Sequence, residues 1–161
     1  MKIGVTGDTH GSQIIIRRLL ANAPAVDCWL HTGDFARDAV YLAKESGLPV
    51  TVVSGNCDAF RAEAKMDEFL PFEGHFVWLT HGHKYLRIGV EELAFWGERF
   101  EADVVVFGHT HVPLISYVGN RLLLNPGSPV LPRSSEGPTF AVLTLKNGIK
   151  PQAEIINLPR L

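Results

Sequence analysis

Five apolar runs of this 161-residue chain are each followed by polar side chains of types that bind metal ions. These candidate ligands are Asp8, His10, Asp34, Asn56, His81, His109 and His111. A single Asp or Asn at such a place is usually a turn residue that hydrogen-bonds its own backbone. Turns alone do not require carboxylate, amide or imidazole groups at five independent run ends. The joint pattern therefore predicts one shared site.

The donor types indicate which metals this site would take. Carboxylate, imidazole and amide groups without a thiolate favour Mn²⁺, Fe²⁺, Zn²⁺, Co²⁺ or Ni²⁺ over copper(I) or an iron–sulfur cluster. A spacing of two, as in Asp8-x-His10 and His109-x-His111, lets both side chains of an extended segment or turn point the same way. Seven ligands exceed the three or four of one catalytic zinc ion. They suit two ions about 3.5–4 Å apart that share a carboxylate.

The elements that must position these side chains alternate in the first half of the chain. Strands are predicted over Lys2–Thr6, Cys28–His31 and Pro49–Val53, and helices over Gln13–Ala23 and Asp38–Ser46. Segments of these lengths form βαβ units with parallel strands. In such folds, functional groups collect on loops just past the carboxyl ends of the strands.

The second half is richer in predicted strands. A hairpin of two strands, a helix and a buried strand are expected over Asp67–Phe72, His75–Thr80, Gly89–Phe100 and Val104–Phe107. The β-rich tail comprises Leu114–Val118, Arg121–Leu124, Thr139–Leu145 and Ile149–Ile156. The long connection Asn125–Pro138 is expected to move. The predicted fold class is α/β, a two-sheet β-sandwich of mixed strands flanked by helices, in one domain over residues 1–161.

The motifs, in their order, resemble a known family. The residues that carry the resemblance to the calcineurin-like metallophosphoesterases are Gly7-Asp8-x-His10, Gly33-Asp34, Gly55-Asn56, His81 and Gly108-His109-x-His111. Within that superfamily, the chain resembles the small prokaryotic phosphodiesterases of the YfcE type. Its short length carries this resemblance, together with the runs Gly55-Asn56-Cys57-Asp58, Thr80-His81-Gly82-His83, Gly108-His109-Thr110-His111-Val112-Pro113 and Asn125-Pro126-Gly127-Ser128. The resemblance extends from Met1 to about Arg133.

The resemblance implies two divalent ions, with Mn²⁺ expected and Ni²⁺, Zn²⁺, Fe²⁺, Co²⁺ or Mg²⁺ as alternatives. The ligands of the first ion would be Asp8, His10 and His111. The ligands of the second would be Asn56, His81 and His109. Asp34 and a hydroxide would bridge the ions. Two divalent ions, two carboxylates and a hydroxide leave a net charge of about +1, which suits a singly charged phosphodiester that the hydroxide attacks in line.

Two further roles have alternatives at this stage. Asn56 is followed by Cys57, where many members of the superfamily have a histidine as candidate general acid. The thiol is therefore either a proton donor or a packing residue. His83 either approaches the substrate or supports His81. The candidate catalytic residues are accordingly Asn56, Cys57 and His83.

Other polar residues receive weaker expectations. His31, on the second predicted strand, is expected to be a hydrogen-bonded core histidine rather than a ligand. Asp58 either orients Cys57 or ends the turn. Arg87 and Arg133 are candidates for substrate contact without an assigned role.

Charge and composition disfavour other classes of protein. The 15 Lys and Arg residues against 17 Asp and Glu give a net charge of −2, which disfavours a basic face for nucleic acid or an anionic membrane. Two cysteines outside a CxxC pair, and no long apolar run, favour the cytoplasm. The predicted function is a dinuclear-metal phosphodiesterase for a small phosphodiester. The alternatives are a phosphomonoesterase or nuclease on the same metals, or a non-catalytic protein-binding scaffold. A homo-oligomer is left open.

Overall fold

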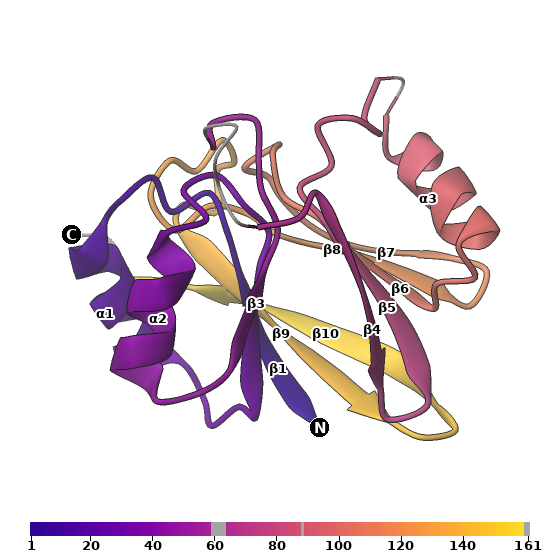
Figure 1. Ribbon diagram of the computed structural model, residues 1–161, viewed down its shortest axis with the longest axis horizontal. Coiled ribbons are helices and arrows are strands. Elements are labelled where there is room, and N and C mark those ends of the chain that lie inside the picture. The colour runs from indigo at the N-terminus through magenta and orange to yellow at the C-terminus, as the bar shows by residue number, and fades with distance from the viewer. Residues whose placement is uncertain (59–63, 88, 160–161) are drawn as a thin grey trace.

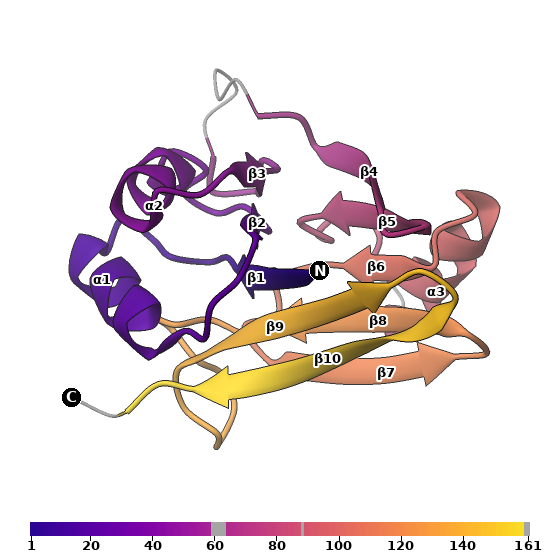
Figure 2. The same cartoon turned by 90° about the horizontal axis from the view of Figure 1, so that it is seen from below.

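The computed structural model describes residues 1–58, 64–87 and 89–159, and this part of the chain forms two five-stranded sheets and three helices (Figure 1). Each sheet mixes parallel and antiparallel pairs. The helices lie on the outer faces of the two sheets, as the view from below in Figure 2 also shows. The predicted two-sheet α/β sandwich flanked by helices is confirmed.

Sheet A has the strand order β10-β9-β1-β2-β3. Its parallel strands are β1 (Lys2–Thr6), β2 (Cys28–His31) and β3 (Val50–Val52). Its antiparallel strands are β9 (Thr139–Lys146) and β10 (Ile149–Asn157). The helices between the parallel strands are α1 (Gln13–Asn22) and α2 (Asp38–Ser46). The predicted βαβ order of the first half is therefore confirmed.

Sheet B has the strand order β4-β5-β6-β8-β7. The bounds are β4 (Asp67–Phe72), β5 (His75–Thr80), β6 (Val104–Val106), β7 (Pro113–Val118) and β8 (Arg121–Pro126). Strands β5, β6 and β8 are parallel, and each edge strand forms an antiparallel hairpin, β4 with β5 and β7 with β8. Helix α3 (Val90–Arg99) covers the outer face. The predicted strand Arg121–Leu124 extends by two residues, so the connection to β9 is shorter than the sequence suggested.

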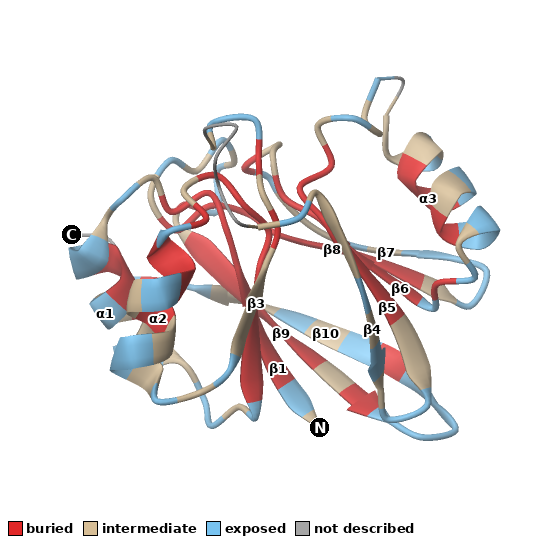
Figure 3. Cartoon of the chain, in the orientation of Figure 1, coloured by how far each residue is buried: buried red, intermediate tan, exposed pale blue. Residues whose placement is uncertain are grey.

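Alternation along the strands divides the apolar side chains between two layers. Val77 and Leu79 of β5 face the core shared by the two sheets, whereas Trp78 packs with Leu93 of α3. All four are fully buried. In Figure 3 the inner strands are buried and the outer faces of the helices are exposed. Each such side chain contributes about 1.5–3 kcal/mol by its burial, and we therefore expect the core to form without a bound ion.

The parallel strands of both sheets direct their carboxyl ends to one edge of the molecule, at the top of Figure 1. Backbone hydrogen bonds hold neighbouring loops together there. Asp8 N–H donates to Gly33 C=O at 2.9 Å, and Gly108 N–H donates to His81 C=O at 3.2 Å. These loops carry the predicted ligands. Within the described residues, no helix is long and apolar enough to cross a membrane.

Candidate metal centre

Five of the seven predicted ligands have a left-handed backbone conformation. Their φ angles are 49° at Asp8, 46° at His10, 52° at Asp34, 69° at His109 and 60° at His111. Positive φ is uncommon outside glycine and costs about 1–3 kcal/mol per residue, and such residues cluster at functional sites. The packed loops at this edge therefore hold the side chains in directions that an ordinary turn does not require.

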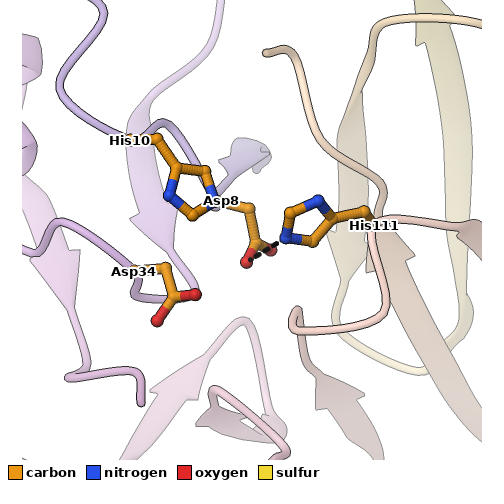
Figure 4. A group of neighbouring side chains, drawn as sticks. All are labelled: Asp8, His10, Asp34 and His111. Carbon is orange, nitrogen blue, oxygen red and sulfur yellow. Dashed lines mark ion pairs between the residues drawn. The ribbon is translucent and has the colours of Figure 1, made fainter. Parts of the chain in front are cut away.

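The first group of donors gathers around Asp8 (Figure 4). One ligand atom from each of Asp8, His10, Asp34 and His111 lies within 4.8 Å of the others. Asp8 Oδ1 and His10 Nε2 are buried and have no hydrogen-bond partner among the described residues. An unpaired buried polar atom costs about 1–3 kcal/mol. A cation at this point would satisfy both atoms, so the residues fit a divalent metal ion.

His111 faces Asp8 across the two sheets. Its Nε2 lies 3.2 Å from Asp8 Oδ1, in the contact of an ion pair rather than an aligned hydrogen bond. The Asp8 carboxylate raises the pKa of His111, and burial opposes this effect. His111 is 3% exposed and Asp8 is fully buried, so solvent screens this pair weakly.

The second group of donors lies on the other side of Asp34. His81 Nε2 is 3.0 Å from Asn56 Oδ1 and 3.4 Å from Asp34 Oδ1. The ring of His109 stands edge-on to the ring of His81, with centroids 5.2 Å apart. Burial disfavours the charged form of Asp34, but the Cys57 N–H hydrogen bond and His81 outweigh it, so the pKa of this carboxyl is lowered. Asp34 thus lies between both groups as a carboxylate.

Backbone carbonyls orient two of the imidazoles. His81 Nδ1 lies 2.8 Å from Thr32 C=O, and His111 Nδ1 lies 2.7 Å from Leu131 C=O. A carbonyl only accepts, so each Nδ1 carries a proton, and each Nε2 is the nitrogen that is left to bind a metal ion. This is the tautomer that a metal-binding histidine needs.

Glycine is required where the loops approach the carboxylates. A Cβ at residue 55 would lie 2.1 Å from Asp34 Oδ1, and a Cβ at residue 108 would lie 2.8 Å from Asp8 Oδ2. Both positions therefore exclude any side chain. The Gly55-Asn56 and Gly108-His109 pairs of the sequence thus combine a ligand with the space that the ligand cluster needs.

Cys57 and His83 both lie beside this cluster. Cys57 is exposed, and its thiol accepts a hydrogen bond from Asn56 Nδ2 at 3.5 Å. Partial desolvation and the nearby Asp34 carboxylate raise the pKa of the thiol to about 11. The His83 ring lies 5.4 Å from the His81 ring, and burial together with His81 lowers its pKa. The catalytic roles of both residues stay predictions.

The sequence left Asp58 with two readings, orienting Cys57 or ending the turn, and missed that it joins two of the ligand loops. Its Oδ1 accepts the Ala36 N–H and its Oδ2 accepts the Gly55 N–H, each at 2.8 Å. The loop after β2, which carries Asp34, is thereby tied to the loop of Asn56. The position of Asp58 two residues after Asn56 was the only available signal.

His31 lies beneath the loop that carries Asp8 and His10, and it is fully buried and hydrogen-bonded as predicted. Its Nδ1 accepts the Gly33 N–H at 3.2 Å, and its Nε2 lies 3.0 Å from Thr9 Oγ1. The Thr9 hydroxyl donates to Asp38 at 2.6 Å, so its oxygen accepts from His31 Nε2. Burial lowers the pKa of His31 to about 4.

The two arginines that the sequence left unassigned are both exposed. Arg133 donates its backbone N–H to the carbonyl of His111 at 3.1 Å, and its positive charge disfavours the charged forms of His109 and His111. Arg87 donates its backbone N–H to Glu92 at 3.0 Å, at the start of α3. Arg133 is therefore the better placed of the two for an anionic substrate.

Comparison with known proteins identifies the family of this chain. The family model described as the calcineurin-like phosphoesterase superfamily domain matches residues 1–148. A probable metallophosphoesterase of Methanothermobacter thermautotrophicus is 36% identical over 160 residues, which cover 97% of this chain and 92% of that protein. The phosphodiesterase MJ0936 of Methanocaldococcus jannaschii is 31% identical over 145 residues, with 79% and 83% covered.

Solved structures share the fold. A predicted phosphoesterase of Streptococcus pneumoniae superposes with a TM-score of 0.81 at 26% identity, covering 97% of this chain and 88% of that one. Vps29 of Entamoeba histolytica, complexed with Zn²⁺, gives a TM-score of 0.76 at 22% identity, covering 99% and 100%. The resemblance inferred from the motifs is confirmed, and the chain belongs to the calcineurin-like phosphoesterase superfamily.

Proposed function

We propose that the protein is a phosphodiesterase that hydrolyses a small phosphodiester at a centre of two divalent metal ions. The observation that carries this proposal is the position of Asp34. Its carboxylate belongs to the cluster with Asp8, His10 and His111, and it also lies 3.4 Å from His81 Nε2. A carboxylate between two groups of donors suits the bridge of a two-metal site.

These contacts support the division of ligands that the resemblance implies. Asp8, His10 and His111 are assigned to the first ion. Asn56, His81 and His109 are assigned to the second, and Asp34 to both. The set consists of oxygen and imidazole nitrogen donors, which supports Mn²⁺ as the expected metal.

The chain's own residues prepare this centre for a phosphodiester. Divalent ions bound there would offset the negative charge of the phosphate oxygens and lower the pKa of bound water, so that hydroxide is available as the nucleophile. Asp8 and Asp34 are buried acceptors that balance part of the positive charge of the ions. Asn56 and Cys57 lie exposed at the rim, where a leaving group would depart. Arg133 adds positive charge on the side of His109 and His111.

Two other readings of the same fold are less well supported. A nuclease needs a basic face, whereas the net charge of this chain is −2. A protein-binding scaffold acts through its surface, yet here the unpartnered polar atoms Asp8 Oδ1 and His10 Nε2 are buried. A cytoplasmic location and a homo-oligomer stay predictions of the sequence.

The test combines metal analysis with a set of substrates. The purified protein is expected to contain close to two equivalents of metal and to hydrolyse bis(p-nitrophenyl) phosphate faster than p-nitrophenyl phosphate or DNA. Chelation with EDTA should stop hydrolysis, and Mn²⁺ should restore it. Faster hydrolysis of the monoester or of DNA would replace the proposed substrate class. No hydrolysis of any of the three would favour the scaffold.

A further inference from the structure

A serine outside the predicted ligand set contacts the candidate metal centre from the segment after β8. Ser128 is fully buried. Its hydroxyl donates to the backbone carbonyl of Asp8 at 3.0 Å and accepts the N–H groups of Val130 at 3.2 Å and Leu131 at 2.9 Å. A hydroxyl has one proton and two lone pairs, so all of its hydrogen-bonding capacity is used.

These contacts continue to a second ligand. The carbonyl of Leu131 accepts Nδ1–H of His111 at 2.7 Å, and His111 Nε2 faces Asp8 Oδ1 at 3.2 Å. The path from Asp8 through Ser128, Leu131 and His111 therefore returns to Asp8. We call it the Ser128 network. It joins the loop after β1 in sheet A to the segment after β8 in sheet B, over a sequence separation of 120 residues, and through His111 to the loop after β6.

Both ligands in the Ser128 network need support from their surroundings. Asp8 has φ 49° and His111 has φ 60°, and strained conformations persist only where neighbouring contacts hold them. Within the described residues, the Asp8 carbonyl has no other hydrogen-bond donor, and Leu131 is the one partner of His111 Nδ1. A metal ion that binds Asp8 and His111 together requires a fixed spacing between two sheets.

We propose that Ser128 is a positioning residue for the first metal ion, an inference that rests on the proposed metal centre. It is not a ligand. Its hydroxyl sets the position of the Asp8 backbone and of the Leu131 carbonyl, and the carbonyl sets the ring orientation of His111. His81 and Asn56 of the second group lie outside the Ser128 network, and His109 contacts it through its backbone N–H, which donates to Asp8 Oδ2 at 3.1 Å. Loss of the hydroxyl should therefore weaken the first metal-binding step much more than the second.

The test is calorimetric titration of metal-free protein with Mn²⁺. Asn56→Ala is expected to remove the second step, which identifies the remaining step as that of Asp8, His10 and His111. Ser128→Ala should lower the affinity of this step about 10–100-fold, the usual effect of losing a group that orients a ligand. Ser128→Thr retains the hydroxyl and should recover much of the affinity.

Ser134→Ala is the matched control. Ser134 lies in the same connection, and its buried hydroxyl has no hydrogen-bond partner among the described residues. Its removal should leave both binding steps unchanged. The proposal is overturned if Ser128→Ala binds Mn²⁺ as the wild type does, or if both steps weaken in parallel with a loss of thermal stability.

A second measurement uses the wild-type protein and requires no variant to fold. In the metal-free protein, nitrogen-15 NMR should show His111 with its proton on Nδ1, in slow exchange with solvent. A His111 ring without a proton on Nδ1 would overturn the proposal. If the wild type binds two ions but hydrolyses no ester, the proposed function fails while a selective effect of Ser128→Ala still supports the network. If the wild type hydrolyses the ester but Ser128→Ala binds Mn²⁺ as the wild type does, the proposed function stands and only the role of Ser128 is rejected.

Discussion

Asp34 Oδ1 lies 3.4 Å from Nε2 of His81, although β2 precedes Asp34 in sheet A and β5 precedes His81 in sheet B. The same oxygen accepts the Cys57 N–H at 2.8 Å. A single carboxylate oxygen of Asp34, which follows sheet A, therefore contacts both a histidine that follows sheet B and the loop that carries Asn56. Its removal should affect both groups of ligands at once.

We expect Asp34→Ala to abolish hydrolysis while the protein stays folded. Removal of the shared carboxylate leaves two cations with less negative charge between them. The loss of kcat/KM on bis(p-nitrophenyl) phosphate should exceed about 100-fold, the upper end for groups that only orient a ligand. Glu136→Gln, which removes an exposed carboxylate outside the predicted ligand set, is the control. Near-normal turnover of Asp34→Ala with added Mn²⁺ would reject the two-metal assignment.

Metal removal should leave the fold intact. The core between the sheets consists of buried apolar side chains and includes none of the predicted ligands, so we expect metal to add stability by mass action. A concentration of 100 times Kd contributes about 2.7 kcal/mol, and the Tm of a domain of this size should rise by about 5–10 °C. Far-UV circular dichroism before and after EDTA, and melting curves with and without Mn²⁺, measure both effects. Loss of the far-UV signal on chelation would show a structural metal site instead.

The apolar runs predicted the elements of the fold well because their alternation reports burial directly. Pro49–Val53 and Arg121–Leu124 differ from β3 and β8 by only a residue or two at their ends. The seven predicted ligands are brought to one edge because the carboxyl ends of parallel strands meet there. The contacts of Asp58 and Ser128 left no such pattern. Each side chain hydrogen-bonds to backbone groups of another loop. Because any residue type can supply a backbone group, such contacts leave no recognisable pattern in the sequence.

Asp58→Asn should weaken binding at the second group of ligands. The amide replaces one acceptor by a donor, which then faces the N–H of Ala36 or Gly55. Metal affinity of the Asn56 step should fall about 10–100-fold, with a smaller effect on the step that contains Asp8. Calorimetric titration with Mn²⁺ measures the two steps separately. Equal affinities in the variant and the wild type would limit Asp58 to ending the turn.

His31 should make the free energy of unfolding depend on pH between about 6.5 and 4. Its folded pKa of about 4 lies below the unfolded value of about 6.5, so the unfolded chain takes up the proton first as the pH falls. Stability is therefore unaffected above pH 6.5 and declines below it, by about 3 kcal/mol in total. His31→Gln retains an acceptor for Gly33 and a donor for Thr9.

The measurement for His31 is urea unfolding of metal-free protein from pH 7 to pH 4. Other histidines titrate in the same interval, so the informative quantity is the difference in slope between the wild type and His31→Gln. The variant should lose less stability as the pH falls. Parallel slopes would show that His31 takes up its proton in the folded state as readily as in the unfolded chain.

Substitution of Cys57 should distinguish its two candidate roles when diesters with different leaving groups are compared. A nitrophenolate departs without a proton, so Cys57→Ala should change kcat/KM for an aryl diester by less than about threefold. An alkoxide needs an acid. If the exposed thiol is that acid, a matched alkyl diester should lose about 10²–10⁴-fold, and Cys57→Ser should retain part of the rate. If the thiol only packs, both diesters should slow by similar small factors. A large and equal loss on both would contradict either role, because it would show that the substitution disturbs Asn56, whose side chain contacts the thiol at 3.5 Å.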